Sequence, residues 1–177
     1  FFVGLQFWRW RICRILGMKK LQIPCNINVY ETLDELPKNV ESLMYEAQHA
    51  RSKAHAPYSN FLVGAALELS NGEIITGNNQ ENAAYPSGLC AERTALFYAH
   101  AQFPKEKIVR MAITAGSIHK ETNTPIPPCG SCRQALIEYE QVQNMPIELY
   151  FMGTEGEIAH SESIENILPW IFDKRLL

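Results

Sequence analysis

The sequence predicts an α/β protein: a three-layer α/β/α sandwich built on a mixed five-stranded sheet. Three observations carry this expectation. Helical and strand patterns alternate along the chain, one strand pattern near the middle is almost wholly apolar and so suits a buried strand, and no long tract of Gly, Ser and Pro divides the chain. A length of 177 residues, with 46% hydrophobic and 20% charged residues, is typical of one globular domain with a substantial core.

The expected elements follow in chain order. Apolar residues at helical spacing predict a first helix over about residues 39–54. Two apolar runs joined by a Ser-Asn-Gly turn predict a β-hairpin over 61–77. The remaining expected elements are a helix over 91–102, a strand over 108–115, a helix over 130–142, a strand over 147–152, a strand over 157–160 and a final helix over 163–172.

The N-terminal residues differ in character from the rest. Residues 1–17 are apolar and aromatic, but Arg9, Arg11 and Arg14 interrupt them, which excludes a membrane span of about 20 apolar residues. A secretory signal would carry its charges before the apolar stretch. We therefore expect residues 1–30 to form an extension and residues 31–177 the functional domain; the alternative for residues 1–17 is an amphipathic helix on a membrane surface.

Charge and cysteine content limit the partners and the compartment. The net charge is −3, residues 1–20 carry +5, and the remainder therefore carries −8, which argues against binding to nucleic acid phosphates. We expect no nucleic acid and no membrane partner. Five cysteines without a secretion signal indicate a cytoplasmic protein in which thiols bind metal or do chemistry.

Two short segments carry most of the chemistry: Cys90-Ala91-Glu92-Arg93 and Pro128-Cys129-Gly130-Ser131-Cys132-Arg133. Each lies where a loop enters an expected helix, and a helix N-terminus favours a thiolate. Alone, the second segment is compatible with a redox pair or half of a zinc ribbon. Together, the segments predict one catalytic Zn²⁺ held by three cysteines, with a fourth position for water and Glu92 beside it.

Two arginines follow metal-ligand candidates directly. Three thiolates around Zn²⁺ leave a net charge of −1, so a positive group is expected nearby. We expect Arg93 to donate hydrogen bonds to the cysteine sulfurs. For Arg133 the sequence leaves two roles open, the same one and an interface salt bridge.

Three longer strings extend the pattern: APYSNFLVGAAL (56–67), GNNQENAAYPSGLCAERTAL (77–96) and PPCGSCRQ (127–134). With them the chain resembles, over about residues 38–172, the short homotetrameric class of the cytidine and deoxycytidylate deaminase family. The resemblance implies hydrolytic deamination of cytidine and deoxycytidine in pyrimidine salvage. It also implies that Cys90, Cys129 and Cys132 hold one zinc ion and that Glu92 shuttles protons.

The same resemblance implies the residues that bind the nucleoside. Phe61 would stack near the pyrimidine, and Asn79 with Glu81 would hold the ribose 3′-hydroxyl. The other matching pocket positions are Asn82, Tyr85 and Ala91. Judged from the residues alone, Phe61 is more often a core residue at the start of a strand, and the Asn-rich loop is equally compatible with a simple turn.

The resemblance also bears on Gln80 and on the C-terminal aromatic residues. Gln80 stands where the family usually has a less polar residue; its side chain should alternate away from the sugar, so it receives no role. In the C-terminal segment, the resemblance matches Phe172 to an aromatic that reaches toward a neighbouring subunit's site in a homotetramer. The alternative is that Trp170 and Phe172 bury a terminal helix against their own domain.

Three other functions share part of this pattern. A related small-molecule aminohydrolase, such as a blasticidin-S deaminase, uses the same scaffold. A noncatalytic zinc module would saturate the metal with a fourth protein ligand and would need no acid beside it. A polynucleotide deaminase is disfavoured, because its first ligand is typically His and its strand-binding groove would be basic.

Overall fold

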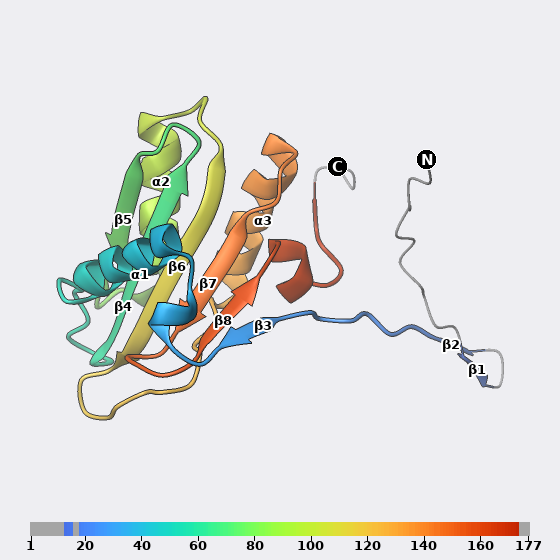
Figure 1. Cartoon of the computed structure of the whole chain (residues 1–177), viewed down its shortest axis with the longest axis horizontal. Coiled ribbons are helices and arrows are strands. Elements are labelled where there is room, and N and C mark those ends of the chain that lie inside the picture. Colours follow the sequence, from blue (N-terminus) through green and yellow to red (C-terminus); the bar gives the residue numbers. More distant parts are fainter. Residues whose placement is uncertain (1–12, 16–17, 174–177) are drawn as a thin grey trace.

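The computed structural model of the chain describes residues 13–15 and 18–173. Figure 1 shows one sheet with helices on both of its faces, and an extended N-terminal segment that leads away from it. Within the described part of the chain, no helix is long and apolar enough to cross a membrane. The alternative of a membrane-surface helix falls mostly on residues 1–12 and 16–17, which lie outside the described residues.

The central sheet has six strands in the order β3-β8-β7-β6-β4-β5. β6 and β7 are parallel, and every other neighbouring pair is antiparallel. A separate two-stranded hairpin, β1 with β2, precedes the sheet. The strands are β1 (Cys13–Ile15), β2 (Met18–Lys20), β3 (Asn28–Tyr30), β4 (Phe61–Leu69), β5 (Ile74–Asn78), β6 (Ile108–Ser117), β7 (Glu148–Met152) and β8 (Ile158–Ser161).

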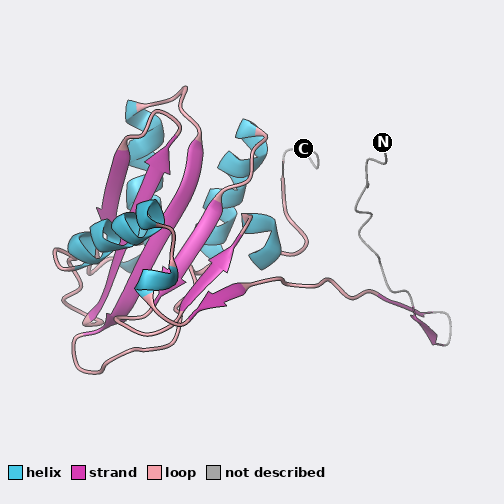
Figure 2. Cartoon of the chain, viewed as in Figure 1, coloured by secondary structure: helices cyan, strands magenta, loops and turns pink. Residues whose placement is uncertain are grey.

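Helices cover both faces of the sheet (Figure 2), and an apolar core lies between the sheet and the helices on each face. One core joins the apolar face of α1 to one face of the sheet, and the other joins α2 and α3 to the opposite face. Buried residues at helical spacing, such as Leu43, Met44 and Ala47, explain why α1 forms as an amphipathic helix. The helices are α1 (Lys38–Arg51), α2 (Ala91–Gln102) and α3 (Gly130–Gln143), with 3₁₀ turns at Leu33–Glu35, Tyr85–Ser87 and Ile164–Ile167.

The three-layer α/β/α class is confirmed, with one strand more in the central sheet than expected and with the hairpin of β1 and β2, also not expected, outside it. The additional strand, β3, pairs Asn28 with His160 and Tyr30 with Ile158 at the edge of the sheet. It lies within residues 1–30, the segment that the sequence analysis assigned to an extension. Three residues are too few to show an alternating pattern, so pairing with β8 is what defines this strand.

The prediction of a final helix over residues 163–172 is wrong. Only the single 3₁₀ turn Ile164–Ile167 forms. Pro169 disfavours a helical conformation at the residue before it, and Leu168 accordingly has φ −133° and ψ 72°. Trp170 then adopts a left-handed conformation with φ 59°. The apolar spacing of this segment therefore reflects local packing rather than a helix.

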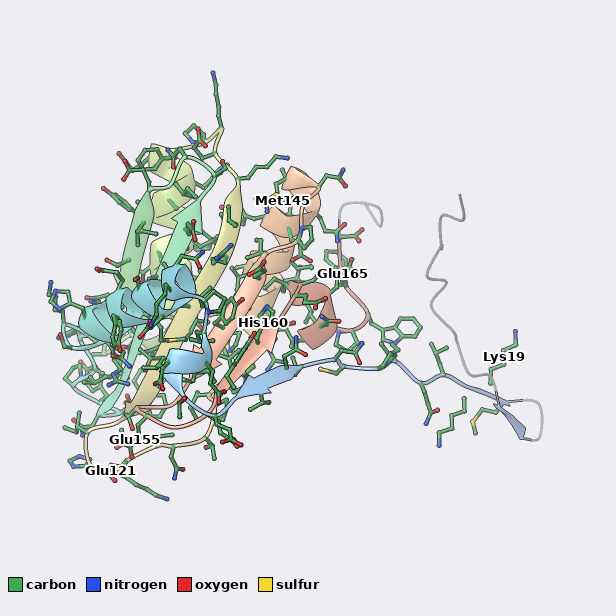
Figure 3. The ribbon with its side chains drawn as sticks, in the orientation of Figure 1. Lys19, Glu121, Met145, Glu155, His160 and Glu165 are labelled. Carbon is green, nitrogen blue, oxygen red and sulfur yellow. The ribbon has the colours of Figure 1, made fainter. Side chains whose placement is uncertain are left out.

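The connections between the strands bring the N-termini of α2 and α3 to the same end of the sheet. Figure 3 labels Glu121 and Glu155 in the loops after β6 and β7, and Met145 at the opposite end, just after α3. α3 connects the parallel strands β6 and β7, so it begins at the end where β6 finishes. α2 follows β5, which runs in the same direction as β6 because both pair antiparallel with β4.

Two glycines allow helices to lie directly against strands. A Cβ on Gly64 of β4 would come within 2.1 Å of the Ala47 carbonyl oxygen in α1. A Cβ on Gly77 of β5 would come within 2.6 Å of the Ala91 carbonyl oxygen in α2. Both contacts are with helix backbone, which cannot move aside as a flexible side chain would. The absence of a side chain at these positions therefore sets the distance between layers.

We expect Gly64→Ala to lower the free energy of unfolding by about 3 kcal/mol, because the new methyl group forces α1 away from β4. For a chain of this size the melting temperature should fall by roughly 6–12 °C. Thermal unfolding followed by circular dichroism measures the change. Gly130→Ala is the matched control, since a Cβ there meets nothing within 4 Å. A melting temperature equal to that of the control would contradict the close-approach argument.

Candidate metal centre and pocket

Three cysteine sulfurs meet at the N-termini of α2 and α3. Cys90 is the residue before α2, Cys129 is the residue before α3, and Cys132 lies in the first turn of α3. The Sγ atoms of Cys90 and Cys129 are 4.0 Å apart, those of Cys129 and Cys132 are 3.5 Å apart, and all three lie within 4.8 Å of one another. Residues 39 positions apart in sequence thus form one cluster.

The dimensions and chemistry of this cluster fit zinc. Zn²⁺ in a tetrahedral site binds thiolates at about 2.3 Å, which puts neighbouring sulfurs about 3.8 Å apart. The two distances above lie on either side of that value. Among the described residues, this group contains three sulfurs and no His, Asp or Glu as a fourth member. A tetrahedral ion held here would therefore keep one position for a non-protein ligand.

The cluster favours an ionised thiol. The Cys132 thiol donates a hydrogen bond to Cys90 and Arg93 adds a positive charge, so the pKa of Cys90 falls to about 5 although burial opposes the change. The pKa of Cys132 is raised, chiefly because its proton serves that hydrogen bond and also because the side chain is buried. A thiolate is the form that binds a metal, so the ionised Cys90 favours a bound cation.

The two arginines have different partners. Arg93 Nη2 donates to the Cys90 sulfur at 3.5 Å. Arg133 instead donates from Nε to the Pro128 carbonyl oxygen at 2.8 Å and from Nη1 to the Ile167 carbonyl oxygen at 2.9 Å. These two bonds fasten the loop before Cys129 to the turn after β8, and neither of them is to a cysteine sulfur.

Glu92 is the buried acid beside the cluster. Its side chain belongs to the first turn of α2, and the residue is only 4% exposed. Burial is the main reason that the pKa of this carboxyl is raised, and the nearby Cys90 thiolate raises it further. A carboxyl whose pKa is shifted toward neutrality can both accept and return a proton near physiological pH.

A pocket of about 490 Å³ opens beside Cys90 and Arg93. Of the residues predicted to bind substrate, Asn79, Glu81, Asn82 and Tyr85 line it. Phe61, Ala91 and Glu92 are not among its lining residues. Tyr58 and Tyr85 meet edge to face at the pocket, with ring centroids 6.2 Å apart, and both rings are exposed. The remaining lining residues are Ser59, Gln80, Gly88 and Leu89.

Asn79 and Glu81 are held by backbone on the pocket wall. The Asn79 side chain donates to the Phe61 carbonyl oxygen at 2.9 Å and accepts from the Val63 amide at 2.8 Å. Glu81 accepts from three donors of the loop before β4: the Tyr58 and Ser59 amides at 2.9 and 3.2 Å and the Ser59 hydroxyl at 2.5 Å. These bonds, led by that hydroxyl, lower the pKa of Glu81, so the carboxylate is ionised at neutral pH.

The other predicted pocket residues contribute to the fold: they are partly or fully buried, or they hold a turn. Phe61 is half-buried at the first position of β4, and Ala91 is fully buried at the first position of α2. The Asn82 side chain accepts from the Ala84 amide at 2.8 Å and so closes a turn. Gln80 donates to the Asn78 side chain at 2.5 Å.

Ser59 has a role at this site that the sequence analysis did not predict. Its hydroxyl contacts both Glu81 and the Phe61 amide, at 2.5 and 3.0 Å. The available signal was the Pro-Tyr-Ser-Asn run, in which a Ser side chain typically bonds a backbone amide two residues on. That pattern predicts a turn, but it does not reveal the Glu81 partner 22 residues away.

The fold and the metal cluster together define a zinc enzyme of the α/β/α class. Residues 37–148, more than half of the chain, match the family model described as cytidine and deoxycytidylate deaminase zinc-binding region. The chain therefore belongs to the cytidine and deoxycytidylate deaminase family, and zinc is its cofactor.

Individual relatives agree with this assignment. A cytidine deaminase from Halalkalibacterium halodurans is 39% identical over 132 residues, which is 75% of this chain and 92% of the relative. A probable cytidine deaminase from Dictyostelium discoideum is 40% identical over 141 residues, or 80% and 86%. The crystal structure of cytidine deaminase from Burkholderia pseudomallei superposes with a TM-score of 0.65 at 40% identity, covering 74% of this chain and 97% of that one.

We expect Cys129→Ala to reduce zinc content from about one ion per chain to well below half, because two thiolates leave the ion without a third protein ligand. Metal analysis of the purified protein by plasma emission spectrometry measures the ratio. Cys25→Ala is the matched control, since Cys25 is an exposed thiol outside the cluster. Unchanged zinc in Cys129→Ala would remove this residue from the ligand set.

Proposed function

We propose that this protein hydrolyses cytidine and deoxycytidine to uridine and deoxyuridine, with release of ammonia, in pyrimidine salvage. The observation that carries the proposal is the arrangement at the two helix N-termini: three convergent cysteine sulfurs beside the buried acid Glu92. A noncatalytic zinc module would complete the metal with a fourth protein ligand, and the part of the chain that the structure describes contributes three to the cluster. The relatives' names support the choice of nucleoside.

Cys90, Cys129 and Cys132 would hold the zinc ion. When bound, zinc lowers the pKa of a water ligand to about 7, so that water becomes a nucleophile at neutral pH. The Arg93 guanidinium offsets part of the negative charge of three thiolates through its hydrogen bond to Cys90. Arg93 thereby keeps the cluster's charge from opposing loss of a proton from the water.

Glu92 would move the protons. It takes one proton from the attacking water and delivers it to N3 of the pyrimidine, while the water oxygen forms a bond to C4. It then transfers the second proton to the exocyclic amino group, the C4–N bond breaks, and ammonia leaves. The burial that raises the pKa of Glu92 makes both acceptance and return of a proton favourable.

The pocket wall would hold the sugar. One amide N–H and one lone pair of Asn79 remain after its bonds to β4, and Glu81 retains acceptor capacity. A single hydroxyl that donates to Glu81 and accepts from Asn79 satisfies both groups. This arrangement fits the ribose 3′-hydroxyl, with Phe61 near the pyrimidine and Asn82, Tyr85 and Ala91 around the pocket.

A substrate panel tests the proposal. Purified zinc-loaded protein is mixed with cytidine, deoxycytidine, CMP and free cytosine, and ammonia release is followed. We expect turnover of both nucleosides, and poor turnover of CMP because the Glu81 carboxylate would face its phosphate. Blasticidin S is added as a fifth compound. Turnover of blasticidin S without turnover of cytidine would favour the related aminohydrolase instead.

We expect Glu92→Gln to keep the fold and the zinc but to lose a factor of about 10² to 10⁴ in kcat, because the amide has the same shape and cannot shuttle protons. Steady-state kinetics with cytidine measure the loss, and metal analysis checks the site. Glu46→Gln, an exposed position on α1, serves as control. Retention of a tenth of the wild-type kcat would exclude Glu92 as the proton carrier.

We further propose that the working form is a cytoplasmic homotetramer with pockets completed by neighbouring subunits. Trp170 and Phe172 are 77% and 58% exposed, so these aromatics are not buried against their own domain. Two exposed aromatics two positions apart are available for contact with a neighbouring subunit. Free thiols at the three metal-ligand positions are consistent with a reducing compartment.

Light scattering at assay concentration tests the assembly, and we expect a mass near 80 kDa rather than the roughly 20 kDa of one chain. Phe172→Ala tests the shared pocket. Loss of activity with an intact tetramer is expected, because the aromatic would close a neighbour's site and exclude water from it. Phe97→Ala is a control of equal size for another exposed aromatic. A fully active monomer would contradict the proposal.

A further inference from the structure

Ser59 lies in the pocket wall where the loop before β4 contacts Glu81. It lies in the loop between α1 and β4, two residues before Phe61 and directly beside Glu81. The loop conformation is unusual, because Asn60 adopts φ 55°, in the left-handed region that non-glycine residues rarely use. The Asn60 amide donates to the Ala56 carbonyl oxygen and its own carbonyl accepts from Ile118, so both sides hold it.

The hydrogen bonds of the Ser59 hydroxyl have a fixed direction. A hydroxyl has one proton to donate. The Phe61 amide donates to Ser59 Oγ at 3.0 Å and cannot accept, so the hydroxyl proton is available for Glu81 Oε1, at 2.5 Å. The two hydrogen bonds therefore point the same way: the Phe61 N–H donates to the Ser59 oxygen, and the Ser59 O–H donates to the Glu81 carboxylate.

Counting acceptor sites shows what this bond leaves for a ligand. An ionised carboxylate offers about four lone-pair sites. The Tyr58 and Ser59 amides both bind Oε2, and the Ser59 hydroxyl binds Oε1. One site on Oε1 remains. Without the hydroxyl, Oε1 would have two open sites, and only the two amides on Oε2 would restrain rotation of the carboxylate about its last bond.

We propose that Ser59 is a positioning residue for sugar recognition: its hydroxyl fixes Glu81 so that one lone pair of Oε1 is presented to one hydroxyl of the nucleoside. The inference rests on the proposed function, because it assigns the ligand of Glu81 to the ribose. Ser59 acts through Glu81 and belongs to substrate binding rather than to proton transfer at Glu92. Its contribution should therefore appear in KM rather than in kcat.

The experiment compares Ser59→Ala with the wild type on cytidine and on 3′-deoxycytidine, which lacks the hydroxyl that Glu81 would bind. For Ser59→Ala we expect KM for cytidine to rise about tenfold, the size of one hydrogen bond to a charged group, with kcat changed by less than about twofold. KM for 3′-deoxycytidine should be unchanged. Adding Ser59→Ala to Glu81→Gln should cost little more, because both act on the same contact.

Two further variants serve as controls. Ser59→Thr keeps a hydroxyl and should restore KM for cytidine to within about threefold of the wild type. Ser52→Ala removes another exposed serine hydroxyl, which donates to the His49 carbonyl oxygen at the end of α1, and should behave as the wild type on both substrates. Melting temperature and zinc content of every variant confirm that fold and metal centre are intact.

The outcomes separate this inference from the function on which it rests. If the wild type does not deaminate cytidine, the proposed function fails and this inference fails with it. If the wild type deaminates cytidine and 3′-deoxycytidine with equal KM, Glu81 does not read that hydroxyl. If the wild type discriminates and Ser59→Ala matches it on both substrates, or loses equally on both, the role of Ser59 is overturned while the function stands.

Discussion

The functional centre depends on two helices that begin at the same place. α3 starts where β6 ends, because it connects two parallel strands. α2 starts at the same end because it follows β5, which runs in the same direction as β6, and Gly77 lets it lie close to β5. The positive ends of both helix dipoles and their free backbone amides therefore face one cluster of sulfurs. That field adds to the hydrogen bond from Cys132 and the charge of Arg93, which favour the thiolate of Cys90. The same convergence buries Glu92 next to the cluster and raises its pKa.

Most of the fold followed from local patterns, and its exceptions have local causes. The helices and the strands β4 to β8 fell close to their expected positions, because their apolar residues repeat at helical spacing or run continuously over a buried strand. β3 (Asn28–Tyr30) was missed, since three residues at a sheet edge carry no period. The expected C-terminal helix failed because Pro169 and the left-handed Trp170 stop what the spacing of Ile164 and Ile167 would otherwise continue.

The site was predictable where residue type alone limits the chemistry. Thiols at positions 90, 129 and 132 have few roles in common other than a metal, and the structure brings them together. The supporting contacts were not predictable. Whether Ser59 meets Glu81, or Arg133 meets Ile167, depends on loops that the tertiary fold brings together over 22 and 34 residues. Such contacts leave no periodic signal in the sequence.

Two hydrogen bonds of Arg133 hold the loop before Cys129 and the turn Ile164–Ile167 together. The guanidinium fork reaches the Pro128 carbonyl on one side and the Ile167 carbonyl on the other, a geometry that the single ammonium of a lysine would not reproduce. Order in one segment therefore restrains the other. Since such coupling is reciprocal, we expect a ligand held at Cys129 to protect the chain around Ile167 from proteolysis, and cleavage there to weaken the hold on that ligand.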